Sequence, residues 1–370
     1  MHISIDALGL NTKRPSGLQV YTEKLIQGLA KVDSKNQYTI FMHHDSGEVY
    51  HAPGGNFHYY TCPVSEKSFE QTLIWKEFFL NRILKKLNID LFHAPANILP
   101  FRISTPSVLT LHDLISYRSQ FSLKEVRHQV WTRFVNQGVQ KAKSIITVSH
   151  SSENQILSQF PRVKDKLHVI YNGLNFGNYV ENYKKTNPKN YILWVGKPLP
   201  HKNLERLIQA YALLLQAGKI DHDLYLVGIE QKDAIYFKKY TRKFKIESKI
   251  CFFPPKSISA LEEVYRGASA VVFPSLSEGF GFPVIEAMHF GIPVLVSDIS
   301  IFKEVAGEAA LYVNPYNVHS IAKGIDAILT DSILRKRLID HGHCQRKLYS
   351  WEISSKNILS IYKLAYSCNV

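Results

Sequence analysis

Short, nearly continuous apolar runs alternate with longer segments of helical period along this 370-residue chain. The runs are rich in β-branched and aromatic side chains. Strands of this kind are buried on both faces, as in parallel sheets that carry helices on both sides. The alternation therefore predicts an α/β fold. The predicted strands cover residues 3–5, 38–42, 57–60, 91–92, 108–111, 145–148, 168–171, 192–195, 224–227, 250–253, 270–273, 294–296 and 311–313. The main predicted helices cover residues 18–30, 70–86, 124–142, 204–216, 234–244, 259–266, 283–290 and 319–329, with more helix toward the end.

The chain is long enough for two domains, and the strand–helix series starts again near its middle. A polar stretch over residues 172–190, rich in Asn and Lys, is typical of a linker between two similar domains. We predict an N-terminal domain over residues 1–175 and a C-terminal domain over residues 176–351. A helix over about residues 352–370 is expected to pack back on the first domain.

Composition limits the class of protein. Hydrophobic residues make up 45% of the chain, which excludes wholesale disorder. No window approaches the roughly 18 uninterrupted apolar residues of a membrane span, and residues 2–6 look like a first strand and not a signal peptide. The four cysteines, Cys62, Cys251, Cys344 and Cys368, are scattered, so neither a disulfide framework nor a zinc ribbon is indicated. We expect a cytoplasmic protein.

The net charge of +14 favours a polyanionic partner, such as nucleic acid, an anionic lipid surface or a phosphorylated small molecule. Charge alone does not choose among them. A nucleic-acid-binding protein is one alternative, although no recognised motif for it is present, and we expect no nucleic acid among the partners. A dinucleotide oxidoreductase would share the sheets, but no G-x-G-x-x-G follows the first strand.

Residues 274–293 carry the strongest chemical signal. Gly279 and Gly281 stand just before a predicted helix, where bare backbone amides at a helix N-terminus suit a phosphate group. Two carboxylates, Glu278 and Glu286, flank this position. Carboxylates repel phosphate, so we expect them to bind hydroxyl groups on either side of it. A sugar–diphosphate–nucleoside has this order of hydroxyls, charge and ribose.

A second phosphate-binding element is predicted over residues 196–203, after the strand at 192–195. Lys197 and Lys202 can neutralise a departing diphosphate, and Asn203 is expected to cap the following helix. A single lysine is more often a solvated surface charge. Here the strand, the glycine, the lysine pair and the cap follow one another, which favours a binding loop.

Together these motifs resemble family 4 of the glycosyltransferases, which are retaining, nucleotide-sugar-dependent enzymes of GT-B architecture. The spacing of Glu278 and Glu286 resembles the Glu-x7-Glu signature of that family, and its Glu-Gly-Phe-Gly-Phe-Pro-x-x-Glu-Ala-Met context is specific. Similar segments occur in order along nearly the whole chain: residues 16–21, 111–113, 145–149, 169–173 and 196–203. The resemblance implies the GT-B fold, in which two Rossmann-like domains with parallel sheets face a central cleft.

The resemblance also implies a role for each matching residue in the N-terminal half and in the basic loop. Gly17 would bring backbone close to the donor diphosphate, and His112 would lie against the transferred sugar. Lys197 and Lys202 would stabilise the leaving nucleoside diphosphate. Many members of the family carry Arg where Lys197 stands. The several N–H donors of a guanidinium group are replaced here by the compact charge of an ammonium group.

In the C-terminal half, the resemblance implies that Glu278 holds sugar hydroxyls and that Glu286 binds the ribose. Phe280 and Gly281 would present backbone amides to the diphosphate. The expected chemistry is electrostatic: transfer on the front face with retention, with the leaving phosphate deprotonating the acceptor hydroxyl. No metal ion and no other cofactor are implied.

The contexts at residues 112–115 and 200–203 look most like mannosyltransferases of bacterial surface-polysaccharide assembly, as in O-antigen, capsule or lipopolysaccharide synthesis. GDP-mannose is the first expectation for the donor and a UDP-sugar the second. The acceptor would be a glycan or a lipid-linked saccharide. Another GT-B enzyme, such as a sugar epimerase or a disaccharide-phosphate synthase, is a further alternative.

The helix predicted over residues 70–86 mixes apolar side chains with Lys76, Arg82, Lys85 and Lys86. One interpretation is a basic amphipathic face that docks on an anionic membrane surface carrying the acceptor. An ordinary helix packed on its sheet explains the pattern equally well. The first interpretation would make the cytoplasmic protein peripheral at the inner face of the membrane.

Overall fold

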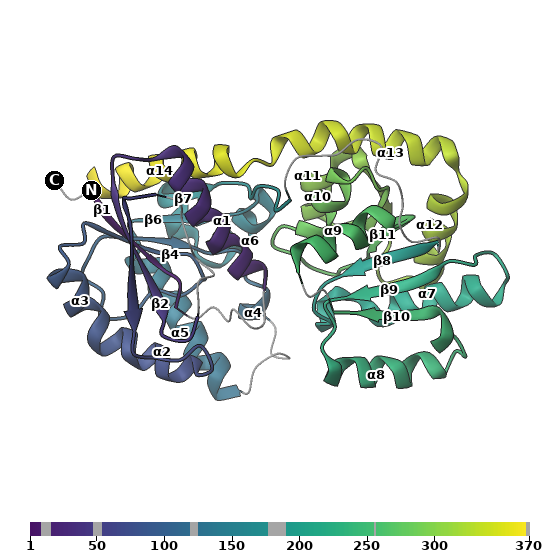
Figure 1. Cartoon of the computed structure of the whole chain (residues 1–370), viewed down its shortest axis with the longest axis horizontal. Coiled ribbons are helices and arrows are strands. Elements are labelled where there is room, and N and C mark those ends of the chain that lie inside the picture. Colours follow the sequence, from purple (N-terminus) through teal and green to yellow (C-terminus); the bar gives the residue numbers. More distant parts are fainter. Residues whose placement is uncertain (9–15, 47–53, 119–124, 177–189, 255–256, 368–370) are drawn as a thin grey trace. The chain divides into compact units, whose positions relative to one another are not determined.

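The computed structural model describes the chain except for residues 9–15, 47–53, 119–124, 177–189, 255–256 and 368–370. The chain divides into two compact units, each with its own parallel sheet (Figure 1). Unit 1 comprises Met1–Gly173 together with Tyr349–Val370, and unit 2 comprises Leu174–Leu348. The sequence placed the boundary between residues 175 and 176 and returned the chain to the first domain at about residue 352. We describe each unit by itself.

Unit 1 is built on a seven-stranded sheet with the order β3-β2-β1-β4-β5-β6-β7. Every pairing is parallel; for example, Ile5 of β1 lies opposite Ile40 of β2 and His93 of β4. The central strands β4, β5 and β6 are buried along their whole length. The strands are β1 (His2–Asp6), β2 (Gln37–His43), β3 (Phe57–Cys62), β4 (Leu91–Ala94), β5 (Ser107–Thr110), β6 (Ser144–Thr147) and β7 (Leu167–Val169).

The helices of unit 1 connect these strands in sequence, apart from the last one. They are α1 (Gly17–Val32), α2 (Phe69–Trp75), the π-helical turn η1 (Lys76–Leu80), α3 (Asn81–Lys86), α4 (Ile115–Arg118), α5 (Glu125–Lys141), α6 (His150–Gln159), the 3-10 segment η2 (Pro161–Lys166) and α14 (Trp351–Ser367). The helix predicted at residues 70–86 is thus α-helical at both ends with a wider turn between.

Helix α14 packs along α1. A Cβ atom at Gly28 of α1 would lie 2.1 Å from Ser355 Oγ, so the glycine permits this close approach. In the interior, the Tyr362 hydroxyl bonds His93 Nδ1 at 2.6 Å, which links α14 to the central strand β4. The final helix is therefore an integral part of unit 1.

Unit 2 has a six-stranded sheet with the order β10-β9-β8-β11-β12-β13, also parallel throughout. Its strands are β8 (Tyr191–Val195), β9 (Asp223–Val227), β10 (Ile250–Phe253), β11 (Ala270–Phe273), β12 (Val294–Ser297) and β13 (Ala310–Val313). Its helices are η3 (Pro200–Lys202), α7 (Leu204–Gln216), α8 (Gln231–Arg242), η4 (Glu247–Lys249), α9 (Ile258–Gly267), α10 (Phe282–His289), α11 (Ser300–Ala306), η5 (Gly307–Ala309), α12 (Val318–Thr330), α13 (Ser332–Gln345) and η6 (Arg346–Leu348).

In both units, the direction in which successive strands are added to the sheet reverses beside the first strand of the unit. In unit 1 the chain runs from β1 to β2 and β3, then returns to β4 on the other side of β1. In unit 2 it runs from β8 to β9 and β10, then returns to β11 beside β8. The loops that leave β8 and β11 therefore diverge to opposite faces of the sheet. Open α/β sheets bind ligands in the crevice at such a point, beyond the carboxyl ends of the strands.

Candidate functional site

Two loops meet at the reversal point of unit 2. The loop after β8 ends in the 3-10 turn η3, which carries Lys202, and the loop after β11 carries Glu278. The backbone N–H of Leu276 donates to the carbonyl of His201 at 2.7 Å and joins the two loops directly. Lys202 Nζ donates to Glu278 Oε1 at 2.6 Å and to Oε2 at 2.7 Å. Two residues that the sequence assigned to different parts of the donor thus form one ion pair.

The Lys202–Glu278 pair is largely but not fully buried. The side chains are 17% and 8% exposed, respectively. The Lys202 ammonium also lies 5.0 Å from the centre of the Phe273 ring, which adds a cation–π contact. An ammonium group has three donors, so it can hold the carboxylate and still bind an incoming oxygen. Glu278 is oriented by Lys202 before any ligand arrives.

Asn203 stands at the N-cap position of α7, as predicted, but its side chain does not make the expected cap hydrogen bond. The residue adopts a left-handed conformation (φ 58°). Its Nδ2 instead donates to the carbonyls of Pro274, at 2.9 Å, and Pro315, at 2.7 Å. The carboxamide satisfies two buried loop carbonyls, and this use of its donors ties the loops after β8, β11 and β13 together.

Helix α10 begins at the same edge of the sheet. Its N-cap residue is Gly281, with φ +95°, a conformation that favours glycine, and a Cβ there would lie 2.9 Å from Phe302 Cε1. The preceding Phe280 is buried, at 3% exposure, against Phe282. Pro283 occupies the second helical position, which suits a residue without an N–H group. The positive end of the helix dipole therefore lies at Gly281, beside the loop that carries Glu278.

Glu286 faces the interior of unit 2 from α10. Its Oε2 accepts from the Tyr265 hydroxyl at 2.6 Å, and its Oε1 accepts from Asn175 Nδ2 at 2.8 Å. Burial raises the pKa of the Glu286 carboxyl, and these two hydrogen bonds oppose that rise. Asn175 was not among the predicted site residues, because an isolated Asn near a linker carries no sequence signal.

Lys197 lies in the same loop as Lys202. It is half-buried, follows Gly196 directly, and its carbonyl accepts from the N–H of Leu199 at 2.8 Å. The loop that contains both lysines is therefore folded as a compact turn at the end of β8. Lys197, Lys202, Glu278, Phe280, Gly281 and Glu286 all belong to unit 2.

Of the two predicted residues of unit 1, Gly17 begins a helix and His112 follows a strand. Gly17 is the first residue of α1, and the Ser16 side chain caps that helix by accepting from the N–H of Gln19. His112 follows β5, and its ring lies edge-on to the ring of Tyr21 at 4.6 Å. Tyr21 belongs to α1, so the helix that Gly17 begins also fixes the histidine.

His112 is held as a neutral, oriented imidazole. Its Nε2 lies 2.9 Å from the carbonyl of Pro95, and its backbone N–H donates to Asn97 Oδ1. A carbonyl only accepts, so Nε2 carries the proton and Nδ1 remains an acceptor. Burial lowers the pKa of His112 to about 4. A neutral ring with a free lone pair tolerates positive charge building nearby, which an imidazolium would oppose.

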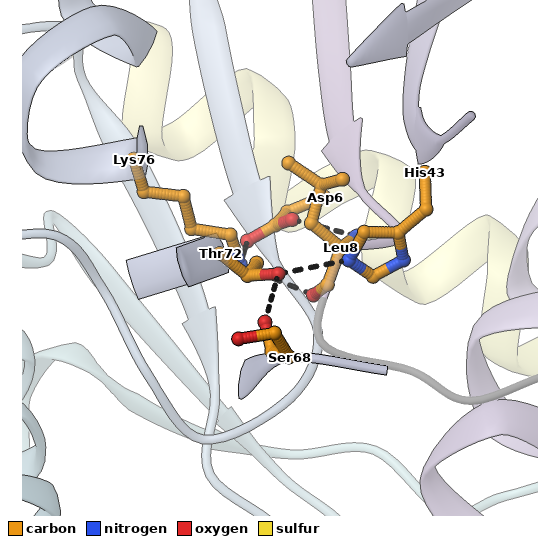
Figure 2. Close-up of polar contacts among 6 residues, drawn as sticks. All are labelled: Asp6, Leu8, His43, Ser68, Thr72 and Lys76. Atoms are coloured by element: carbon orange, nitrogen blue, oxygen red, sulfur yellow. Dashed lines mark hydrogen bonds and ion pairs between the residues drawn. The ribbon is translucent and has the colours of Figure 1, made fainter. Parts of the chain in front are cut away.

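Lys76 was expected on a basic helical face, and the structure corrects this. Its Nζ donates to Asp6 Oδ2 at 2.6 Å and to the carbonyl of Leu8 at 3.1 Å, at the end of β1 (Figure 2). The two side chains are 6% and 4% exposed. Beside them, His43 Nε2 bonds Thr72 Oγ1 at 3.0 Å. The wider turn that begins at Lys76 directs it inward, toward the carboxylate at the sheet edge.

The rest of the segment α2–η1–α3 does leave an exposed patch. We define the apolar–basic patch as Ile74, Phe78, Phe79, Arg82 and Lys85. The three apolar side chains are 58%, 59% and 50% exposed, and both cations are exposed. The Arg102 guanidinium stacks over Phe78 at 4.7 Å from the ring centre. No helix in the described ranges is long and apolar enough to span a bilayer.

Two segments carry closely spaced side chains of the kinds that bind metals, residues 221–223 (Asp-His-Asp) and 341–344 (His-Gly-His-Cys). Asp221 pairs with Lys249 at 2.6 Å and lies before β9, at its amino end. His341 Nδ1 lies 3.2 Å from the carbonyl of Glu308. Within the residues that the structure describes, no three His, Cys, Asp or Glu side chains are grouped as metal ligands.

Comparison with protein families decides the identity. Residues 15–177 match the model "Glycosyltransferase Family 4", and residues 176–343 match "Glycosyl transferases group 1". The chain is a family 4 glycosyltransferase. The two matched ranges correspond to the parallel sheets of unit 1 and unit 2.

Curated relatives of the transferase include bacterial mannosyltransferases. The O-antigen chain mannosyltransferase RfbU of Salmonella typhimurium is 33% identical over 239 residues, which are 61% of this chain and 62% of that enzyme. The match therefore spans less than two thirds of the Salmonella enzyme. The O-antigen chain mannosyltransferase B of Escherichia coli is 27% identical over 283 residues, 74% of each chain.

Solved structures place the transferase in the GT-B fold. Sucrose-phosphate synthase of Thermosynechococcus elongatus superposes with a TM-score of 0.81 at 18% identity, over 100% of both chains. The Anabaena protein HepE, solved in complex with UDP-glucose, superposes with a TM-score of 0.72 at 17% identity, over 98% of this chain and 99% of that chain. At these identities the likeness concerns the fold alone.

Proposed function

We propose that this glycosyltransferase transfers mannose from GDP-mannose to a saccharide or lipid-linked acceptor in the synthesis of a cell-surface polysaccharide, with retention of configuration. The mannosyl and polysaccharide parts of the proposal are supported by the relatives named for O-antigen chain mannosyl transfer. The donor site is supported by one observation above all: Lys202 and Glu278 meet where the strand order reverses, beside the N-terminus of α10.

In the proposed reaction, the bond between the anomeric carbon and the diphosphate breaks while the acceptor oxygen bonds to the same face of that carbon. Lys202, Lys197 and the backbone at Gly281 stabilise the charge that builds on the departing diphosphate. Glu278 holds sugar hydroxyls, and Glu286 binds the ribose. The leaving phosphate takes the proton of the acceptor hydroxyl, so no protein nucleophile is needed.

The proposed role of unit 1 rests on Gly17 and His112. The start of α1 at Gly17 presents backbone N–H groups to the diphosphate. Neutral His112 orients the sugar and accepts positive charge at the anomeric carbon. Because two ammonium groups and two helix N-termini supply the positive field, we expect turnover to persist in EDTA.

A thermal-shift panel of nucleotide sugars tests the donor. GDP-mannose at about 100 times its dissociation constant should stabilise the protein by about 2.7 kcal/mol. A response to a UDP-sugar and none to GDP-mannose would reassign the nucleotide. The absence of a thermal shift with every GDP- and UDP-sugar would contradict the proposed function.

We also propose that the apolar–basic patch docks on an anionic membrane surface that carries the acceptor. Exposed Phe78 and Phe79 can enter the headgroup region while Arg82 and Lys85 meet lipid phosphates. This would hold the cytoplasmic enzyme peripherally at the inner face of the membrane.

Sedimentation with vesicles rich in anionic lipid tests this docking. The triple variant Arg82→Glu/Lys85→Glu/Lys86→Glu should lose binding, and salt should weaken binding of the wild type. The matched control is Lys238→Glu/Lys239→Glu/Arg242→Glu, which makes the same charge change on exposed positions of α8. Equal binding by both variants and the wild type would refute the docking.

A further inference from the structure

The segment that connects the two units is hydrogen-bonded to Glu286, the carboxylate that is proposed to bind the ribose. Unit 1 ends its first part at Gly173, and Asn175 follows two residues later as part of unit 2. Asn175 Nδ2 donates to Glu286 Oε1 at 2.8 Å. The next residue, Phe176, packs edge-on against Phe290 at 4.8 Å and against Tyr265 at 5.7 Å. The hydrogen bond of Asn175 and the ring of Phe176 therefore hold this segment on unit 2.

Glu286 depends on that attachment for its orientation. It is almost completely buried, at 6% exposure, and each of its two carboxylate oxygens accepts one hydrogen bond, from Asn175 and from Tyr265. A carboxylate has about four acceptor positions, so both oxygens can still accept from ribose hydroxyls. A buried carboxylate that lost one of its two donors would be less favourably ionised. Asn175 thus sustains both the direction and the charge of this group.

We propose that Asn175 is a positioning residue for the nucleotide: it holds Glu286 charged and aligned for the ribose, and so links nucleotide binding to the anchoring of the segment between the units. This rests on the proposed function, in which Glu286 binds the ribose. The linkage is reciprocal. A nucleotide that needs Glu286 aligned strengthens the hold on Leu174–Phe176, and loosening that segment weakens nucleotide binding.

The surroundings of Glu286 make its pH response interpretable. Tyr265 from α9 is buried and stays neutral, because burial and the nearby Glu286 carboxylate raise its pKa well above 10. His289, in the last turn of α10, has its pKa lowered to about 4 by burial and by nearby Arg346 and Arg266. Above pH 5 neither group changes charge. The terminal phosphate of the nucleotide titrates at about pH 6 in every variant, so it is the difference in pH dependence between Asn175→Ala and the wild type that reports Glu286.

The test measures the dissociation constants of GDP and UDP for the full-length protein at pH 7.5 and pH 5.5. Asn175→Ala should weaken binding about 10-fold at pH 7.5, the effect of one hydrogen bond to a charged group. The loss should be larger at pH 5.5, because removing a donor raises the pKa of Glu286 further. With GDP-mannose as substrate, KM should rise while kcat changes little, since the ribose is remote from the reacting bond.

Two control variants separate this from general loosening. Asn172→Ala makes the same chemical change three residues earlier, and Phe176→Leu weakens the aromatic anchor, yet neither residue bonds Glu286. Both should keep the wild-type pH dependence. Hydrogen exchange adds a readout: GDP should slow exchange at residues 174–176 in the wild type and much less in Asn175→Ala.

The outcomes distinguish the two proposals. A wild type that binds neither nucleotide overturns the proposed function, and this inference with it. If the wild type binds and Asn175→Ala binds equally well at both pH values, the proposed function stands and the inference fails. A pH dependence changed equally by Asn172→Ala would also overturn it.

Discussion

The two units each hold a lysine–carboxylate pair at the edge of the sheet where the strand order reverses. In unit 1, Lys76 meets Asp6 at 2.6 Å with 6% and 4% of the side chains exposed. In unit 2, Lys202 meets Glu278 at the same distance with 17% and 8% exposed. In the sequence, Lys76 belongs to a predicted helix and Lys202 to a predicted loop after a strand. Their surroundings differ, and the surroundings decide what each pair can do.

Side chains and backbone of unit 1 shield the Lys76 ammonium from solvent. This ammonium also donates to the carbonyl of Leu8, and Thr72 and His43 pack beside it (Figure 2). The two hydrogen bonds of the Lys202 ammonium both go to one carboxylate, on a loop beside a helix N-terminus. The first pair stabilises the fold, whereas the second is a charge pair that a ligand can still reach.

Breaking the closed pair should have the largest effect on stability. Lys76→Ala leaves the Asp6 carboxylate buried without its partner, which costs about 3–5 kcal/mol. Urea unfolding monitored by circular dichroism measures this loss. Lys76→Met, which keeps the stem of the side chain, should recover part of the packing but not the charge. A loss below about 1 kcal/mol for Lys76→Ala would show that the pair is not structural.

Acid should distinguish the two units. Burial lowers the pKa of His43 and His112 to about 4 and of His93 to about 3, all in unit 1, whereas unit 2 has His289 at about 4. The unfolded chain binds these protons near pH 6.5, so stability is full above that pH and falls as the pH drops toward 4. At pH 5.5 the loss is roughly 1.4 kcal/mol for each histidine. Hydrogen exchange should show unit 1 opening before unit 2; the reverse order would contradict this assignment.

The open pair should matter more for turnover than for folding. Lys202→Ala removes a charge that stabilises the leaving diphosphate, so kcat should fall on the order of 10²-fold. The loss of stability should stay below that of Lys76→Ala, because the partner carboxylate lies nearer to solvent. Initial rates with GDP-mannose and matched urea curves measure both. Wild-type turnover would remove Lys202 from the site.

Glu278→Gln should have a smaller effect on rate. The amide keeps the shape of the side chain but loses the ion pair and leaves sugar hydroxyls poorly held, so we expect a loss of about 10-fold. Because Lys202 orients Glu278, the double variant with Lys202→Ala should lose less than the product of the two single effects. Strict multiplicativity would contradict the coupling of the pair.

An exposed pair gives the smallest effect. Lys356 of α14 meets Glu352 at 2.6 Å, but the two side chains are 61% and 62% exposed. Solvent screens such pairs, and many contribute nothing measurable. Lys356→Ala should therefore leave urea unfolding unchanged within error, which makes it the control for both other lysines. A clear destabilisation would mean that distance, and not burial, governs these pairs.

The strands could be predicted because a strand buried on both faces is an almost uninterrupted apolar run, and each predicted run overlaps a strand of the structure. Helices α4, α6 and α11 were not predicted. α6 (His150–Gln159) is mostly polar and begins at a serine cap, so periodicity gives little signal, and α11 (Ser300–Ala306) is short. Short or polar helices depend on their packing, which a local pattern does not contain.

The site could be predicted only where its residues lie close together in the sequence. The spacing of Glu278 and Glu286 and the Lys202 loop were visible in sequence. The roles of Asn175 and Asn203 were not, because each acts on a group about 70 or more residues away. Lys76 was misassigned for a similar reason: the π-helical turn that points it inward has no sequence signature.

The return of α14 to unit 1 has a consequence for biosynthesis. The first unit starts at β1, yet the surface of α1 that receives α14 stays uncovered until residues beyond 350 have left the ribosome. Unit 2, whose residues form one continuous stretch, has by then been synthesised in full. Unit 1 is thus the first unit to begin synthesis and the last to complete its fold. A nascent chain stalled before α14 would present an incomplete core to chaperones and proteases.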